Sequence, residues 1–177
     1  LLVSALGVLR ERAGGAGVDP GVRLHVNGAA SGGDELDLAS LAAQEGVADL
    51  VTFSGPVPAP ALAAQFRAAD VVAMPSASET YGLVALEAQA CGTPVLAHRV
   101  GGLVYAVLDG VSGRHVTAGT PEAWADALAE ILADRDAWAA LGTGAVRHAA
   151  GHSWEAYADG LLEAVTAVPR RSPGLDA

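Results

Sequence analysis

The sequence predicts an α/β fold of the doubly wound type, in which helices cover both faces of a parallel sheet. Short β-type runs alternate with helical segments along most of the chain, and this alternation is typical of parallel βαβ units. The run VVAM at 71–74 is uniformly apolar, as expected of a strand that is buried on both faces. A length of 177 residues suffices for one domain with a substantial core.

Five short runs of β-forming residues are expected to be the strands of this sheet. Turn residues such as Asn27-Gly28 and Gly55-Pro56 close them, because these residue types favour turns. The expected strands are 22–26, 50–54, 71–74, 94–97 and 114–116. In a Rossmann-like sheet of this kind, ligands bind beyond the carboxyl ends of the strands. The segment 75–82 is therefore a candidate site.

Helices are expected before, between and after these strands. Pro60 and Thr120-Pro121 mark helix starts, since proline suits the first helical turn and threonine is a good N-cap. Gly46 and Gly92 mark helix ends. The expected helices are 1–13, 36–45, 61–69, 82–91 and 103–108, a helical region from 121 onward, and a last helix from Ser153.

The domain organisation that follows is simple. We expect one domain over 1–168, a small polar loop at 29–34, and a disordered tail over 169–177, which is rich in proline and arginine.

Composition and charge exclude several classes of function. The formal net charge is −10 and all ten basic residues are Arg, so the chain lacks both the basic surface of a nucleic-acid binder and the lysine of a Schiff-base enzyme or a P-loop. The single cysteine, Cys91, excludes an internal disulfide and a cysteine-cluster metal site. We predict no metal, no cofactor, no nucleic-acid partner and no transmembrane segment. The cysteine usage favours a cytoplasmic protein.

Two glutamates, Glu79 and Glu87, flank the start of the helix expected at 82–91. A helix N-terminus leaves amides unpaired and carries a partial positive charge. Gly82 removes side-chain bulk there, so Thr80 to Leu83 form a candidate phosphate cradle. Eight residues rise about 12 Å on a helix, too far for the facing carboxylates of a retaining glycosidase, which lie about 5 Å apart. Two interpretations stay open: solvated acids at a helix end, or two grips on an elongated ligand with a pyrophosphate between them.

Other reactive side chains favour structural roles. His148 and His152 are four residues apart, a spacing that can make half a zinc site on a helix, but no third ligand is evident and we expect ordinary surface histidines. Cys91 is expected to be a small packed residue rather than a nucleophile. For Gly101-Gly102, a simple turn and a site of close ligand approach are equally open.

The segment PSASETYGLVALEAQACGTPVLA at 75–97, followed by VGGL at 100–103, resembles the E-x7-E region of retaining GT-B glycosyltransferases of the family-4 type. Further blocks match the same family in order: VTFSG at 51–55, RAADVVAMPS at 67–76, DGVSGRHV at 109–116 and HSW at 152–154. The resemblance extends from about 22 to 162. E-x7-E alone is a weak pattern, whereas the ordered set of blocks is specific. Within the family, EAQACGTPV and VGGL are most similar to members that move GlcNAc from UDP-GlcNAc to inositol phosphate in mycothiol synthesis.

The resemblance implies roles for individual residues. Glu79 would be the catalytic-site residue that contacts the hydroxyls of the donor sugar, and Glu87 would bind the ribose hydroxyls. The backbone amides of Thr80, Tyr81, Gly82 and Leu83 would meet the donor's sugar and phosphate. The loop that holds Val57 would face the base, although the family often has arginine where this chain has valine.

The resemblance also implies that the chain begins inside the donor-binding domain. The family's first strand, the Arg and Lys that hold the diphosphate, and the acceptor domain would precede Leu1. In the order 3-2-1-4-5-6 that first strand is central, so the strands at 22–26 and 71–74 would flank a gap or pair directly. We therefore expect the donor-binding part of a hexosyltransferase that is inactive by itself. A non-catalytic nucleotide-sugar binding or remnant domain is the alternative, and a sugar-nucleotide epimerase is a related enzyme possibility.

Overall fold

The computed structural model describes residues 1–28 and 37–167, and its elements follow the expected order. The strands are β1 (Leu24–Asn27), β2 (Val51–Ser54), β3 (Val72–Met74), β4 (Val95–His98) and β5 (Gly113–Val116). The helices are α1 (Leu2–Ala13), α2 (Leu38–Gln44), α3 (Ala59–Ala68), α4 (Leu83–Ala90), α5 (Leu103–Ala106), α6 (Pro121–Ala133), α7 (Arg135–Ala150) and α8 (Trp154–Ala167), with a 3₁₀ turn η1 (Ala48–Leu50). The expected loop at 29–34 and the expected tail at 169–177 lie outside the described residues.

Local signals in the sequence account for most helix boundaries. The Thr120 hydroxyl accepts a hydrogen bond from the Ala123 amide and so caps α6. Asp134 ends α6 and caps α7 through the Ala137 amide, which divides the helical region expected after 121 into separate helices. Gly14 ends α1 with a positive φ of 127°, a conformation that glycine adopts without steric cost.

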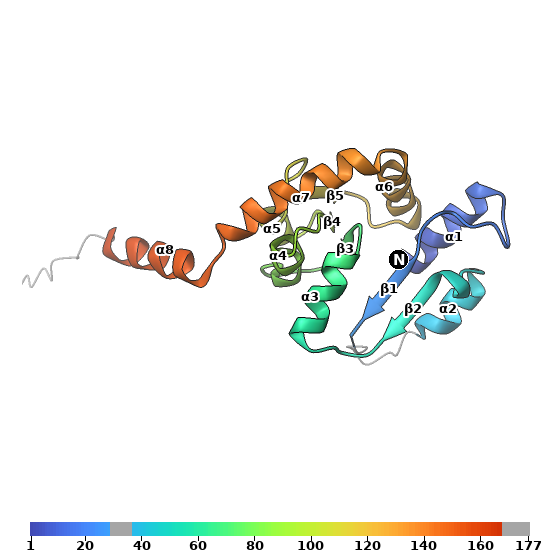
Figure 1. Cartoon of the computed structure of the whole chain (residues 1–177), viewed down its shortest axis with the longest axis horizontal. Coiled ribbons are helices and arrows are strands. Elements are labelled where there is room, and N and C mark those ends of the chain that lie inside the picture. The colour runs from blue at the N-terminus through green and yellow to red at the C-terminus, as the bar shows by residue number, and fades with distance from the viewer. Residues whose placement is uncertain (29–36, 168–177) are drawn as a thin grey trace, which may run out of the picture.

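The strands form two parallel sheets rather than one (Figure 1). β1 pairs with β2 in the register Leu24 to Val51, and β3, β4 and β5 pair in that spatial order. Within the described residues, no strand pairs with the edges of β1 and β3 that face away from their partners. Of the two arrangements expected for β1 and β3, the structure therefore shows a gap and not direct pairing.

One prediction about burial is wrong as a result. The apolar run at 71–74 was expected to be buried on both faces, yet β3 is only half-buried. The most buried strand is β4, where Val95, Leu96 and Ala97 are at most 1% exposed and only the last residue, His98, is half-buried. The physical reason is position: β4 has a hydrogen-bonded neighbour on each side, whereas β3 is an edge strand.

Two apolar clusters stabilise the chain. The larger one packs α1 against α6 and includes side chains from both sheets, among them Leu24 and Leu96. The smaller one gathers α4, α5 and β4 around Leu86, Val95 and Leu103. It is this smaller cluster that fixes the position of α4, and hence of the candidate site at its N-terminus.

Helix α8 differs from the other helices. None of its residues is buried, and Figure 1 shows it extending away from the rest of the chain. Within residues 1–28 and 37–167, no helix is both long and apolar enough to cross a membrane.

Candidate functional site

The candidate site lies at the N-terminus of α4, in the loop that follows β3. Gly82 is the residue before α4 and has a left-handed φ of 94°. A Cβ atom on Gly82 would lie 2.8 Å from the Cβ of Ala106, so both backbone conformation and packing require glycine there. The first intrahelical hydrogen bond runs from the Leu86 amide to the Gly82 carbonyl at 3.1 Å. The preceding amides of α4 are therefore oriented toward the loop without an intrahelical acceptor.

The Glu79 carboxylate lies over this helix N-terminus. Its Oε1 accepts hydrogen bonds from the amides of Tyr81 at 3.4 Å and Gly82 at 3.3 Å. Both distances exceed those of strong N–H···O bonds, so the amides are only weakly satisfied. The partial positive charge of the helix N-terminus favours a carboxylate here. An anionic ligand would meet the same amides, and Glu79 would have to yield part of this contact.

Glu87 is the fifth residue of α4, just over one helical turn from its start, and is exposed. Among the described residues its side chain has neither a hydrogen bond nor an ion pair, so its carboxylate oxygens are available to a ligand. The structure does not bring Glu79 and Glu87 together as a facing pair, because one caps the helix and the other stands on its side.

The remaining predicted residues divide into two groups. Thr80, Tyr81 and Leu83 lie in the same loop and first helical turn as Glu79, and the side chains of Tyr81 and Leu83 are 45% and 55% exposed. Val57 is half-buried in the separate connection between β2 and α3. No hydrogen bond within the described residues ties that connection to either glutamate.

Sequence reasoning missed His98 as a residue that holds the site loop. His98 ends β4, and its Nδ1 lies 3.0 Å from the carbonyl oxygen of Ser76. The loop after β3 is thus attached to the end of the neighbouring strand. The available signal was a polar residue directly after the buried run 95–97, since the carboxyl ends of parallel strands lie at one edge of a sheet.

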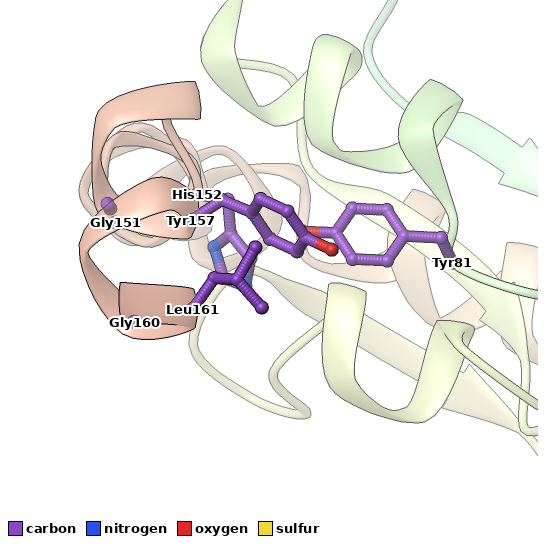
Figure 2. Close-up of a pocket in the computed structure, with 7 residues that line it drawn as sticks. Tyr81, Gly151, His152, Tyr157, Gly160 and Leu161 are labelled. Atoms are coloured by element: carbon purple, nitrogen blue, oxygen red, sulfur yellow. The ribbon is translucent and has the colours of Figure 1, made fainter. Parts of the chain in front are cut away.

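A cavity of about 320 Å³ adjoins the site, between the loop of Tyr81 and helix α8. Figure 2 shows Tyr81 and Tyr157 pointing toward one another across it, with His152 and Leu161 beside them. Two phenol hydroxyls and an imidazole give this mainly apolar cavity a few hydrogen-bonding groups. The side chain of Tyr81 therefore faces α8, while its backbone amide lies at the N-terminus of α4.

The histidine pair of α7 and the turn after it has a structural role that the sequence did not indicate. His148 is half-buried rather than a surface residue, and its Nε2 lies 3.2 Å from the Ala106 carbonyl at the end of α5. His152 is exposed, and its Nδ1 lies 3.0 Å from the His148 carbonyl. In the described part of the chain, no group of three or more His, Cys, Asp or Glu side chains is arranged to hold a metal ion. Burial, and secondarily the charge of His152, lowers the pKa of His148.

Acidification below the ordinary histidine pKa of about 6.5 is therefore expected to destabilise the chain through His148. The folded chain resists protonation of the His148 side chain more than the unfolded chain does. The free energy of unfolding is therefore unaffected by His148 well above a pH of about 6.5, and it decreases as the pH falls below that value. His148→Gln keeps a donor for Ala106 and cannot titrate. It should reduce the loss in urea midpoint between pH 7.5 and 5.5. Equal losses in the variant and in the unaltered chain would contradict this expectation.

Comparison with known proteins agrees with the arrangement of strands and helices around this site. A model of the family described as glycosyl transferases group 1 matches residues 1–148. The D-inositol 3-phosphate glycosyltransferase of Thermobispora bispora is 55% identical over 129 residues, covering 73% of this chain and 30% of that protein. The enzyme of the same name from Paenarthrobacter aurescens is 44% identical over 177 residues, covering 97% and 42%. The chain thus spans less than half the length of these curated relatives.

Solved structures share the fold. HepE from Anabaena in complex with UDP has a TM-score of 0.77 and 25% identity, over 94% of this chain and 44% of that one. Sucrose-phosphate synthase from Thermosynechococcus elongatus has a TM-score of 0.72 and 32% identity, over 93% and 42%. The parallel strands, the interposed helices and the family match over 148 residues agree with the GT-B architecture that the ordered motifs predicted. The chain therefore belongs to the group 1 family of glycosyl transferases.

Proposed function

We propose that this chain is the donor-binding part of a retaining glycosyltransferase that moves a hexose from a nucleotide diphosphate sugar to a hydroxyl acceptor. The observation that carries the proposal is the placement of Glu79 over the weakly satisfied amides of the α4 N-terminus, with Glu87 exposed farther along the same helix. Together they offer hydrogen-bond acceptors on either side of an anion-binding helix end.

Different parts of the donor molecule would contact different groups of the site. Glu79 would accept hydrogen bonds from the hexose hydroxyls, the amides around Gly82 would face the sugar and phosphate, and Glu87 would accept from the ribose hydroxyls. The connection that holds Val57 would contribute backbone contacts to the base. In the transfer, the bond between the sugar's anomeric carbon and the diphosphate oxygen breaks, and the acceptor oxygen bonds to that carbon on the same face. The proton of the acceptor hydroxyl passes to the departing diphosphate oxygen, and the nucleoside diphosphate is released.

The relatives support a particular donor and acceptor. Solved complexes of HepE contain UDP and UDP-glucose, and the curated relatives are named for inositol 3-phosphate. We propose UDP-GlcNAc as the donor and inositol phosphate as the acceptor, in the cytoplasm and in mycothiol synthesis. The acceptor would be held by a part of those proteins that this chain does not cover, so this chain alone is expected to transfer no sugar.

Calorimetric titration of the chain with UDP, GDP and UDP-GlcNAc tests the proposal. We expect both uridine nucleotides to bind more tightly than GDP. Their dissociation constants should be about 0.1–1 mM, because among the described residues no cationic side chain contacts Glu79, Glu87 or the amides at the start of α4. If the chain binds none of the three nucleotides, the proposal is contradicted and a non-catalytic remnant is favoured. Sugar transfer by this 177-residue chain would contradict the proposal that the acceptor is held by a part of the relatives that this chain does not cover.

A further inference from the structure

The turn at Gly101-Gly102 lies directly against the backbone of the loop that carries Glu79. The Gly102 amide donates a hydrogen bond to the Glu79 carbonyl at 2.8 Å. A Cβ atom on Gly101 would lie 2.1 Å from that same carbonyl oxygen, and one on Gly102 would lie 2.5 Å from the Thr80 carbonyl oxygen and 2.6 Å from the Tyr81 Cα. The atoms that would clash all belong to the backbone, so no side-chain rotation can relieve the contact.

The requirement for glycine at position 102 concerns space and not backbone conformation. Gly102 has φ −64° and ψ −22°, which any residue adopts. A larger residue would therefore leave the start of α5 intact and push the Glu79 loop away. This separates Gly102 from glycines such as Gly82, whose left-handed φ independently excludes other residues.

Helix α5, which Gly102 precedes, is itself attached from its other end. The Ala106 carbonyl at the end of α5 accepts a hydrogen bond from the side-chain Nε2 of Gln89 at 2.7 Å and lies 3.2 Å from the His148 Nε2. Gln89 is fully buried on α4, and a second hydrogen bond joins it to the Ala85 carbonyl. The turn at Gly101-Gly102 thus precedes a short helix that hydrogen bonds tie to α4 and α7.

We propose that Gly101 and Gly102 are positioning residues for Glu79. By allowing backbone contact and by donating the Gly102 amide, they set the place from which the Glu79 carboxylate reaches the donor sugar, while Glu87 is held by α4 alone. This inference rests on the proposed function. The sequence left two interpretations of this glycine pair open, a simple turn and a site of close ligand approach. The inference differs from both, because the segment that approaches the glycines is the Glu79 loop of the same chain.

The test is Gly102→Ala, measured by titration with UDP and with UDP-GlcNAc. Because loss of a hydrogen bond to a charged group weakens binding by about 10- to 100-fold, we expect UDP-GlcNAc to bind at least about tenfold more weakly. UDP should weaken by a smaller factor, because the displaced loop also carries amides that face the phosphate, whereas Glu87 and the rest of α4 stay in place. Gly142→Ala is the matched control. Its Cβ would lie 2.6 Å from the Gly92 carbonyl oxygen, an equally close backbone contact at the opposite end of α4.

A purely structural role would move both ligands together. If Gly102→Ala weakens UDP and UDP-GlcNAc by the same factor, or leaves their ratio unchanged as Gly142→Ala is expected to do, the inference is overturned. Failure of the unaltered chain to bind UDP instead contradicts the proposed function, so the two failures are distinguishable.

Amide hydrogen exchange in the unaltered chain provides a measurement that does not depend on the stability of the variant. We expect the Gly102 amide to be protected about as well as the amides of β4, because it donates to Glu79. Exchange as fast as that of the Gly101 amide, for which no acceptor is found among the described residues, would overturn the inference even where Gly102→Ala does not fold or where no nucleotide binds.

Discussion

Replacement of Trp124 with alanine is expected to lower the free energy of unfolding by about 3–5 kcal/mol. Trp124 is fully buried on α6, in the cluster that packs α6 against α1 and contains residues of both sheets. Its Nε1 has no hydrogen-bond partner in the described part of the chain, so its contribution is apolar packing. Because a domain of ordinary size is stable by only about 5–15 kcal/mol, the variant should unfold at much lower urea concentration, as followed by far-ultraviolet circular dichroism.

Trp154→Ala is the control for this substitution. Trp154→Ala removes the same kind of side chain from α8, where Trp154 is 79% exposed. The free energy of unfolding should therefore change by no more than about 0.5 kcal/mol. Similar losses for the two variants would contradict the assignment of the core to the α1 and α6 interface.

Replacement of Glu87 with alanine is expected to weaken binding of UDP by about 10- to 100-fold, the range for hydrogen bonds that involve a charged group. The side chain is exposed on α4 and has no partner within the described residues, so its removal should leave the urea midpoint unchanged. Glu79→Ala should weaken UDP-GlcNAc by a similar factor and UDP much less, because Glu79 is assigned to the sugar and Glu87 to the ribose.

The control is Glu163→Ala, an exposed helical glutamate on α8, which should change neither affinity nor stability. If Glu87→Ala binds UDP as the unaltered chain does, the ribose contact is wrong. If Glu79→Ala weakens UDP and UDP-GlcNAc equally, the division of the donor between the two carboxylates is wrong.

These predictions depend on a site that is visible in the sequence only in part. The residues 79–87 could be proposed as site residues because the ordered motifs mark them, and because glycine before an apolar helix indicates an open N-terminus. Their geometry could not. That Glu79 caps the amides of Tyr81 and Gly82 depends on the course of the loop, and the loop is fixed by His98 and Gly102, which contact it from β4 and from the turn before α5.

The contact made by His148 also could not be predicted from the sequence. Its spacing from His152 indicated only a surface pair or half a metal site. The contact with the Ala106 carbonyl joins residues 42 positions apart, and no local pattern predicts such a pair. The fold had to bring α5 against α7 before the role of His148 in supporting the site became apparent.

Periodicity, caps, turn residues and motif order are local properties, and they were sufficient to predict the order and type of the elements and the family, and to propose Glu79 and Glu87 as candidate site residues. The folded chain was needed to show that the strands form two sheets, that β4 is buried over Val95–Ala97 whereas β3 is only half-buried, and that the Gly102 amide contacts the Glu79 carbonyl. The physical reason is that strand pairing, burial and backbone contact depend on which distant segments meet, and residues adjacent in the chain do not specify their partners.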